Sequence, residues 1–211
     1  MSAELAERLR HVYWIGGGSG GGKSTIARRL ADRYGLRLYD TDAMMREHTE
    51  RSSVADAPML AEFVRMDFDE RWLHRDPRTM LETFHWFRGE GFGHIVDDLL
   101  ALPAAPGVLV EGFRLLPRLV RPLLADPRHA VWLLPTPEFR RYALEHRGGT
   151  WSVAGRTSDP PRALHNLLTR DRMFTDRLAG EVRALDLPAI EVDGTVGEDE
   201  LTARVAAGFG L

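Results

Sequence analysis

Residues 12–25 read VYWIGGGSGGGKST, and this stretch decides the fold of the chain. From Gly17 onward it matches G-x-x-x-x-G-K-[ST], the pattern of a phosphate-binding loop. The apolar residues 12–15 before the glycines predict a buried strand, and residues 26–31 (IARRLA) follow with helical spacing. A strand, a glycine loop and a helix in this order are the structural context that the motif requires.

The loop has the residue types needed to hold a triphosphate. Glycines let the backbone bend so that successive N–H groups point to one place, and the helix N-terminus adds the positive end of its dipole. Lys23 is expected to reach the β- and γ-phosphates, and Ser24 to offer its hydroxyl to Mg²⁺. The expected nucleotide contacts are Gly17, Gly18, Ser19, Gly20, Gly21, Gly22, Lys23, Ser24 and Thr25.

Lys23 is also the single lysine of the chain. Lysine and arginine together number 28, and every one of them except Lys23 is arginine. Lysine is a compact point charge with three donors whereas arginine is a planar fork, so the two are not interchangeable at a phosphate site. We therefore predict that the chain binds a nucleoside triphosphate.

The composition narrows the class of protein. With 211 residues, 44% of them hydrophobic and 28% charged, the chain is expected to form one globular domain. The net charge of −3 gives no support to a nucleic-acid partner, and no apolar run reaches the roughly 18 residues of a membrane span. The absence of cysteine excludes disulfides, and the polar residues 1–10 do not resemble a signal peptide, so we expect a cytoplasmic location.

Further apolar runs alternate with helical patterns along the rest of the chain. They predict strands at 36–39, 108–110, 130–134 and Ala189–Val192. Helices are expected at Lys23–Tyr34, 58–74, 77–87, 95–102, 117–124, 137–146, 162–185 and 198–207, the third of them begun by Asp76 as N-cap and Pro77 at the first position. Five buried strands alternating with helices indicate a parallel sheet covered on both faces.

In the order of these parts the chain resembles the P-loop kinases of the nucleoside monophosphate kinase and shikimate kinase type. The resemblance rests on the glycine loop, on Asp40-Thr41-Asp42 where that group has D-x-D or D-[ST]-D, and on the glycine turn at residues 192–195. It implies one three-layer P-loop NTPase domain over residues 1–211, with strand order 2-3-1-4-5. It also implies an acceptor-binding helical insertion at about 43–102, an arginine lid at about 147–162, ATP and Mg²⁺ as cofactors, and Asp193 beside the adenine.

The chain departs from the pattern of these kinases on the acceptor side. Residues 111–114 (EGFR) stand where shikimate kinase has a Gly-Gly turn, and the insertion does not match the base-reading segments of common nucleotide kinases. Chloramphenicol phosphotransferases are a third similar group, with one strand-terminal aspartate as the base.

Phosphoryl transfer needs a group that orients and deprotonates the acceptor, and Asp42 is our candidate. It ends a predicted strand, at the edge where α/β sheets bind ligands. Asp40 is expected to support Mg²⁺ through water. The alternative for Asp42 is that it caps a helix beginning at Ala43.

Other candidates surround the predicted acceptor. Glu111 ends the third strand and is expected on the metal side or the acceptor side. Arg114 would bind an anionic acceptor or, alternatively, is a solvated loop residue. Trp86 and Arg88 precede the glycines at 89–93 and are the acceptor-site candidates of the insertion, whose other aromatic residues (Trp72, Phe84, Phe87 and Phe92) are expected mostly in the core.

Arginines dominate the predicted lid. Arg140, Arg141 and Arg147 follow the fourth strand, Arg156 lies in the loop, and a helical stripe carries Asn166, Arg170, Met173 and Arg177. We expect at least two of these arginines to contact phosphate, Arg170 and Arg147 first. The alternative for each of these arginines, considered individually, is an exposed surface charge without a ligand.

These features predict a phosphotransferase that moves the γ-phosphoryl group of ATP to a hydroxyl or phosphate of a small molecule or nucleotide. A nucleoside monophosphate kinase is the alternative within this class. An ATPase or a nucleotide-binding regulatory module without an acceptor is the alternative from another class. A GTPase switch is excluded because its guanine motif, Asn/Thr-Lys-x-Asp, needs a second lysine.

Overall fold

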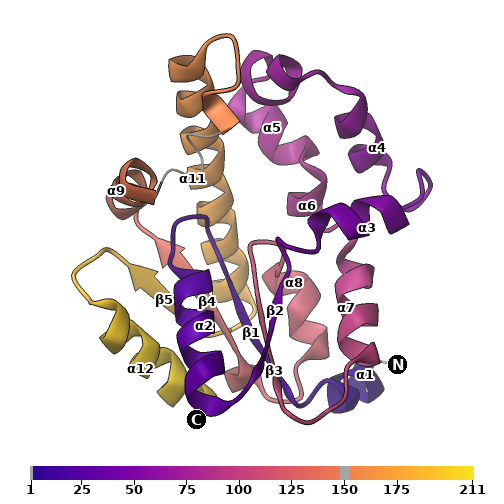
Figure 1. Cartoon of the computed structure of the whole chain (residues 1–211), viewed down its shortest axis with the longest axis vertical. Coiled ribbons are helices and arrows are strands. Elements are labelled where there is room, and N and C mark those ends of the chain that lie inside the picture. The colour runs from indigo at the N-terminus through magenta and orange to yellow at the C-terminus, as the bar shows by residue number, and fades with distance from the viewer. Residues whose placement is uncertain (1, 148–152) are drawn as a thin grey trace.

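A sheet of parallel strands lies at the centre of the computed structural model, which describes residues 2–147 and 153–211 (Figure 1). The strands in the described part are β1 (Val12–Gly17), β2 (Arg37–Asp40), β3 (Val108–Glu111), β4 (Ala130–Pro135) and β5 (Ala189–Val192). Their order is β2-β3-β1-β4-β5, and every neighbouring pair is parallel. The predicted P-loop NTPase architecture is therefore confirmed.

Both faces of the sheet are buried because successive strand residues point to opposite sides. Ile15 packs against α2 (Lys23–Tyr34) and α12 (Glu198–Phe209) on one face. Its neighbour Trp14 packs on the other face, which is covered by α1 (Ser2–Arg8), α7 (Phe92–Ala101), α8 (Pro117–Val120) and α11 (Pro160–Ala184). The predicted helices over 23–34, 137–146, 162–185 and 198–207 correspond to α2, α9 (Pro137–Arg147), α11 and α12. The remaining short elements on the sheet are the 3-10 turns η2 (Arg121–Leu123) and η3 (Pro127–His129).

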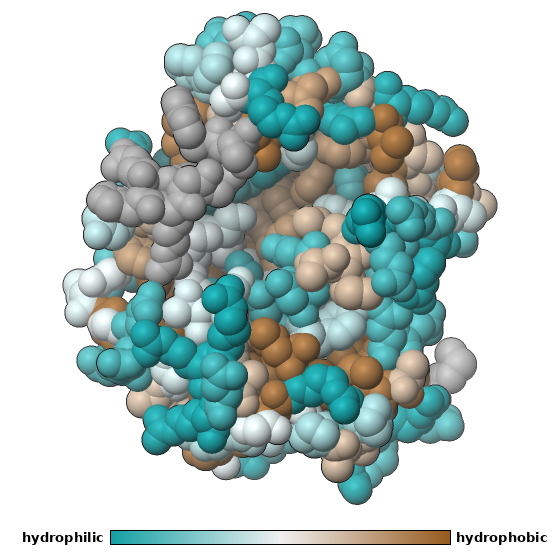
Figure 2. All heavy atoms as spheres, viewed as in Figure 1, coloured by the Kyte–Doolittle hydropathy of each residue, from teal (hydrophilic) through white to brown (hydrophobic). Residues whose placement is uncertain are grey.

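Residues 43–102 form a series of short helices, of which those up to residue 88 lie above the strand ends and the last, α7, lies beside the sheet (Figure 1). They are α3 (Met45–Arg51), α4 (Pro58–Arg65), the π-helical turn η1 (Glu70–His74), α5 (Pro77–Thr83), α6 (His85–Arg88) and α7. Asp76 caps α5 as predicted, accepting from the backbone N–H groups of Arg78 and Thr79. Figure 2 shows this face of the molecule hollowed below the upper helices.

The predictions of unbroken helices over 58–74 and 77–87 are wrong. The first breaks at Met66 and the second at Phe84, where the backbone is extended. At the first break Arg71 donates to the carbonyls of Phe63 and Val64, at 2.9 and 2.7 Å, and so caps the end of α4. The sequence still shows helical spacing of apolar residues across both breaks, because Phe63, Phe84 and Phe87 pack into the same hydrophobic cluster.

Helix α1 has no counterpart among the predicted elements. It is only seven residues long and mostly polar, so it is too short to show the repeated apolar spacing that predicts a helix. Its end is anchored by Leu9, which is 1% exposed in the core below the sheet. None of the described helices is both long and apolar enough to cross a membrane.

Candidate active site

The glycine loop joins β1 to α2 and closes around Lys23. The Lys23 ammonium donates to the carbonyl of Gly18 at 2.8 Å, and the N–H of Gly18 donates to Leu133 at 3.2 Å. A Cβ on Gly17 would lie 2.0 Å from the Leu133 oxygen, and one on Gly18 would lie 2.5 Å from the Thr175 hydroxyl. Glycine is therefore required where the loop packs against β4 and α11.

Lys23 is 8% exposed, and its environment is strongly charged. Burial lowers the pKa of Lys23, while the charges of Asp42 and Glu111 raise it. The ammonium group thus sits where the ends of β2 and β3 direct two carboxylates toward the loop.

The carboxylates that end β2 have different surroundings. Asp40 Oδ1 accepts from the N–H groups of Asp42 and Ala43, at 2.8 and 3.2 Å, and so fixes the turn. Asp42 is exposed, yet desolvation by the protein around it raises the pKa of its carboxyl, and the charge of Asp40 adds to this while Lys23 opposes it. Helix α3 begins at Met45 and has no side-chain cap, so the alternative role of Asp42 as a helix cap is wrong.

Glu111 is 2% exposed at the end of β3, paired in register with Ile15 on one side and Asp40 on the other. Burial raises the pKa of its carboxyl, whereas a hydrogen bond from Ser24 lowers it. Ser24 therefore faces a buried carboxylate at the end of the loop. Among the described residues no three His, Asp or Glu side chains are grouped as in a metal site, and the roles of Ser24 and Asp40 toward Mg²⁺ stay predictions.

A buried carboxylate on α11, Asp171, joins two of the predicted lid arginines. It accepts from Arg140 and, at 2.7 Å, from Arg170 Nε, and all three side chains are less than 10% exposed. Although burial opposes ionisation, the charges of Arg170 and Arg140 hold the pKa of Asp171 below its ordinary value. Sequence reasoning missed Asp171, because a single Asp among arginines on a long helix gives no signal of its own.

The two arginines keep donors that nothing in the described part of the chain satisfies. Nε and Nη1 of Arg140 and Nη1 of Arg170 are buried without a hydrogen-bond partner among the described residues. A Cβ on Gly20 would lie 3.6 Å from Arg140 Cγ, so Arg140 borders the loop, and Arg170 lines a cavity together with Ser19. Buried unpaired N–H groups of guanidinium are costly, and an anion at the loop would satisfy them.

The other predicted lid residues are placed differently. The side chain of Arg147 and residues 148–152 lie outside the described residues. Arg156 stacks on Phe68 of the insertion at 4.4 Å from the ring centroid, and Ser158 donates to Asp69 at 2.9 Å. Two further candidates pair with the same carboxylate at the surface: Arg177 contacts Glu82, and Arg88 lies 3.2 Å from it. The structure therefore does not bring Arg88 to the cavity that Ser19 and Arg170 line.

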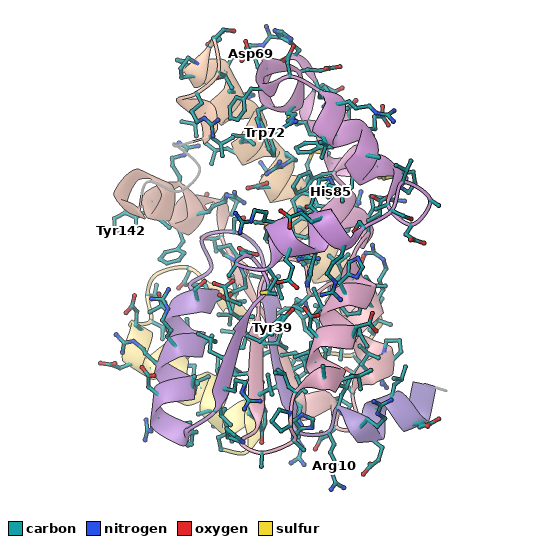
Figure 3. The ribbon with its side chains drawn as sticks, turned by 45° about the vertical axis from the view of Figure 1, so that its right-hand side comes forward. Arg10, Tyr39, Asp69, Trp72, His85 and Tyr142 are labelled. Carbon is teal, nitrogen blue, oxygen red and sulfur yellow. The ribbon has the colours of Figure 1, made fainter. Side chains whose placement is uncertain are left out.

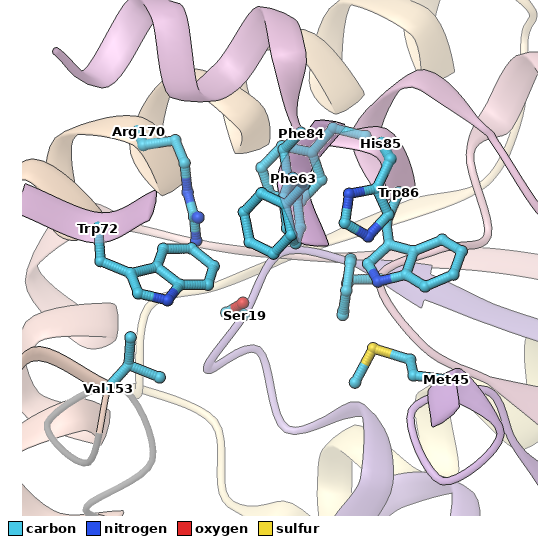
Figure 4. Close-up of a pocket in the computed structure, with 11 residues that line it drawn as sticks. Ser19, Met45, Phe63, Trp72, Phe84, His85, Trp86, Val153 and Arg170 are labelled. Atoms are coloured by element: carbon cyan, nitrogen blue, oxygen red, sulfur yellow. The ribbon is translucent and has the colours of Figure 1, made fainter. Parts of the chain in front are cut away.

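A cavity of about 350 Å³ lies between the glycine loop and the insertion (Figure 4). Most of its lining is aromatic, and the described lining residues are Ser19, Met45, Phe63, Trp72, Phe84, His85, Trp86, Phe87, Phe113, Val153 and Arg170. In Figure 3, Trp72 and His85 lie in the upper helical part and Tyr39 lies near the strand ends. Of the aromatic residues expected mostly in the core, Phe84 and Phe87 are buried, whereas Trp72 and Phe92 are partly buried. Trp72, Phe84 and Phe87 also line this cavity.

Arg114, after β3, is 2% exposed, so its alternative as a solvated loop residue is wrong. Its guanidinium lies 4.0 Å from the ring centroid of Trp86. It donates to the carbonyls of Thr41 and Gly91, both at 3.2 Å, and to His48 Nδ1 at 2.9 Å. Burial lowers the pKa of Arg114 to about 10. Arg114 thus ties the end of β2 to the insertion.

A buried histidine extends this connection. Because Arg114 donates to Nδ1 of His48, the imidazole proton is on Nε2 and is donated to Asp98 at 2.8 Å. Asp98 also accepts from Tyr39 at 2.5 Å and from Arg51 at 2.6 Å. Burial lowers the pKa of His48. None of these partners was predicted, because nothing in the sequence links residues so far apart.

The glycine turn after β5 is held by Asp193. Its Oδ1 accepts from the Thr195 N–H at 2.9 Å and from the Thr195 hydroxyl at 2.7 Å. Gly194 has φ 85°, and a Cβ there would lie 2.8 Å from the Phe139 ring on α9. The predicted contact of Asp193 with a nucleotide stays a prediction.

A comparison with protein families agrees with the geometry of the loop. A model of the shikimate kinase family matches residues 19–68 of the chain. The matched segment runs from the phosphate loop through α2 and β2, includes Asp40 and Asp42, and ends just after α4. This match and the strand order β2-β3-β1-β4-β5 together place the chain in the P-loop kinase superfamily.

Proposed function

We propose that the protein is an ATP- and Mg²⁺-dependent phosphotransferase that moves the γ-phosphoryl group to a hydroxyl of a small molecule. The observation that carries this proposal is the set of unpaired, buried N–H groups on Arg140 and Arg170. They belong to two arginines bridged by one carboxylate, one bordering the phosphate loop and one lining the adjacent cavity. A transferring phosphoryl group has the charge and the acceptor oxygens that such donors need.

The residues of the loop fit a nucleotide with its metal ion. Lys23 and the N-terminus of α2 would hold the β- and γ-phosphates, and Ser24, which faces Glu111, would hold Mg²⁺. When bound, ATP supplies the phosphoryl group and Mg²⁺ neutralises the charge of its phosphates. The abundance of ATP in the cytoplasm fits the expected location.

Asp42 is proposed to receive the proton of the acceptor hydroxyl. Its raised pKa makes it a better base than an ordinary aspartate, and Lys23 keeps its ionised form available. A carboxylate at this position would repel a phosphate acceptor, so a hydroxyl acceptor is favoured over the nucleoside monophosphate alternative.

Transfer from γ-labelled ATP to a panel of hydroxylated metabolites, nucleoside monophosphates and antibiotics tests the proposal. We expect label in at least one hydroxylated acceptor, and loss of both nucleotide binding and transfer in Lys23→Ala. Steady hydrolysis without transfer to any acceptor would instead favour the ATPase alternative. Transfer only to nucleoside monophosphates would favour the nucleotide kinase alternative.

A further inference from the structure

The cavity beside the phosphate loop has walls made mainly of aromatic rings. Phe63, Trp72, Phe84, Trp86 and Phe113 all contribute to it. The ring centroids of Phe63 and Trp72 are 5.3 Å apart, and those of Phe63 and Phe84 are 5.4 Å apart, both pairs in an edge-to-face arrangement. Such a wall presents both ring edges and ring faces, which suit a planar π-system.

The wall also contains an uncharged hydrogen-bonding group, the imidazole of His85. His85 is 2% exposed, and its Nδ1 is buried without a hydrogen-bond partner among the described residues. Burial lowers its pKa to about 3, with the charges of Arg114, Arg71 and Arg75 acting in the same direction. The imidazole is therefore neutral at physiological pH and would orient a hydroxyl or carbonyl of a ligand.

The positive charge of the cavity lining comes from a guanidinium that packs against the aromatic wall. Arg170 is the only charged side chain among the described lining residues. Its guanidinium is held by Asp171 and by ring faces, with centroids at 5.4 Å for Trp72 and 5.2 Å for Phe84. In Figure 4 this side chain descends toward the Trp72 ring, with Phe63 beside it. The proposed function assigns the free N–H of Arg170 to the transferring phosphoryl group, so the described lining has no second cation to pair with a carboxylate or phosphate of an acceptor.

We infer that the acceptor is an uncharged alcohol or phenol built on one or two aromatic rings. This inference rests on the proposed function and assigns its substrate class. Burying an acceptor's carboxylate or phosphate against these rings without a partner would be costly, whereas a planar apolar ligand gains from every wall contact. A volume of about 350 Å³ matches the lower range of small-molecule sites.

Transfer to an alcohol or phenol forms one bond to phosphorus and breaks one. The acceptor oxygen forms a bond to the γ-phosphorus as the bond from that phosphorus to the β–γ bridging oxygen breaks. The bridging oxygen keeps the electron pair and leaves with ADP, and the acceptor proton goes to Asp42 and from there to solvent. The products are an aryl or arylalkyl phosphate ester and ADP.

Calorimetric titration and labelled transfer with defined probes test the inference. The aromatic probes are 2-(indol-3-yl)ethanol and 2-naphthylmethanol, and the polar probes are shikimate and AMP. One variant, Met45→Trp, fills the cavity from α3, and a matched control, Val64→Trp, places the same side chain at a position that is 53% exposed. ATP affinity and Tm are measured for each protein, so that loss of folding is distinguished from a blocked cavity.

We expect both aromatic probes to bind at least tenfold more tightly than shikimate and AMP, and to accept label. Met45→Trp should weaken aromatic binding at least tenfold while leaving the Kd for ATP within twofold, and Val64→Trp should change neither. Tighter binding of shikimate or AMP, or equal aromatic binding in Met45→Trp, would overturn the inference and leave the proposed phosphotransferase standing. Aromatic binding without transfer to any acceptor would sustain the cavity assignment and contradict the proposed function instead.

Discussion

Asp171 lies between the guanidinium groups of Arg140 and Arg170 and is almost completely buried. One carboxylate therefore compensates one of two buried positive charges, and the other charge remains for a ligand. In a buried ion pair the attraction between the charges offsets the free energy of removing them from water. Removal of one partner therefore leaves an uncompensated buried charge and is strongly destabilising.

The substitution Asp171→Asn should destabilise the free protein by about 3–5 kcal/mol, because it leaves two buried guanidinium groups without a carboxylate. Urea unfolding measures this loss. Part of it should be recovered by inorganic phosphate, which supplies the missing negative charge. The matched control is Asp176→Asn on the same helix. A loss below about 1 kcal/mol in Asp171→Asn would show that the bridge contributes little.

Asp42 sets the pH dependence of the proposed reaction. The base must be ionised, and its pKa is raised, so kcat/KM should fall as the pH decreases through that raised value, at less acidic pH than for an ordinary aspartate. Asp42→Asn should lower the rate of transfer about 10²–10⁴-fold and remove this acid limb, while ATP still binds. Unchanged transfer in Asp42→Asn would mean that Asp42 is not the base.

At the scale of elements, three segments meet in one hydrogen-bonded chain. Asp98 on α7 accepts from His48 on α3, and His48 accepts from Arg114 after β3, which in turn donates to the carbonyl beside Asp42. This chain fixes the insertion relative to the end of β2. In the proposed reaction, His48 and Asp98 are therefore positioning residues that act through Arg114.

His48→Leu should remove the acceptor for Arg114 and the donor for Asp98, and so loosen the position of Asp42. We expect kcat to fall about tenfold or more, with the Kd for ATP unchanged. His48→Asn, which can keep one of the two hydrogen bonds, should recover part of the rate, and Glu47→Gln on the exposed side of α3 serves as the control. A change in Tm alone, with normal kcat, would assign His48 a purely structural role.

The elements themselves were largely predictable, and their side-chain partners were not. The strands and the helix after the glycine loop follow from local apolar periodicity, which depends on near neighbours in the chain. The burial of Arg114 depends on His48, 66 residues away, and the bridge from Arg140 to Asp171 spans 31 residues. Such pairings arise only once the fold brings the elements together, so Arg114 had no feature that distinguished it from a surface arginine.

At the scale of the whole molecule, the proposed donor and acceptor regions both lie at the carboxyl ends of the strands. The loop, α9 and α11 gather around the phosphate site, and α3 to α6 form the cavity wall above it (Figure 1). Arg170 belongs to both regions, because it lines the cavity and shares Asp171 with Arg140.

Nucleotide binding should therefore stabilise the whole chain. At a concentration one hundred times Kd, ATP with Mg²⁺ should add about 2.7 kcal/mol, which corresponds to a rise in Tm of about 5–10 °C for a chain of this length. Thermal unfolding followed by circular dichroism measures the shift. Lys23→Ala should show no shift at the same concentration, and an equal shift in that variant would contradict a phosphate site at the loop.

The single lysine gives the chain a built-in reporter. Lys23 is buried at the phosphate loop, and burial lowers its pKa, so a larger fraction of its amine is unprotonated than for a surface lysine. An acylating reagent small enough to enter would therefore modify one side-chain amine, apart from the chain's amino terminus. Because a bound nucleotide would cover that amine, intact-mass spectrometry would read occupancy of the proposed donor site as one acyl group fewer on an occupied molecule than on an empty one.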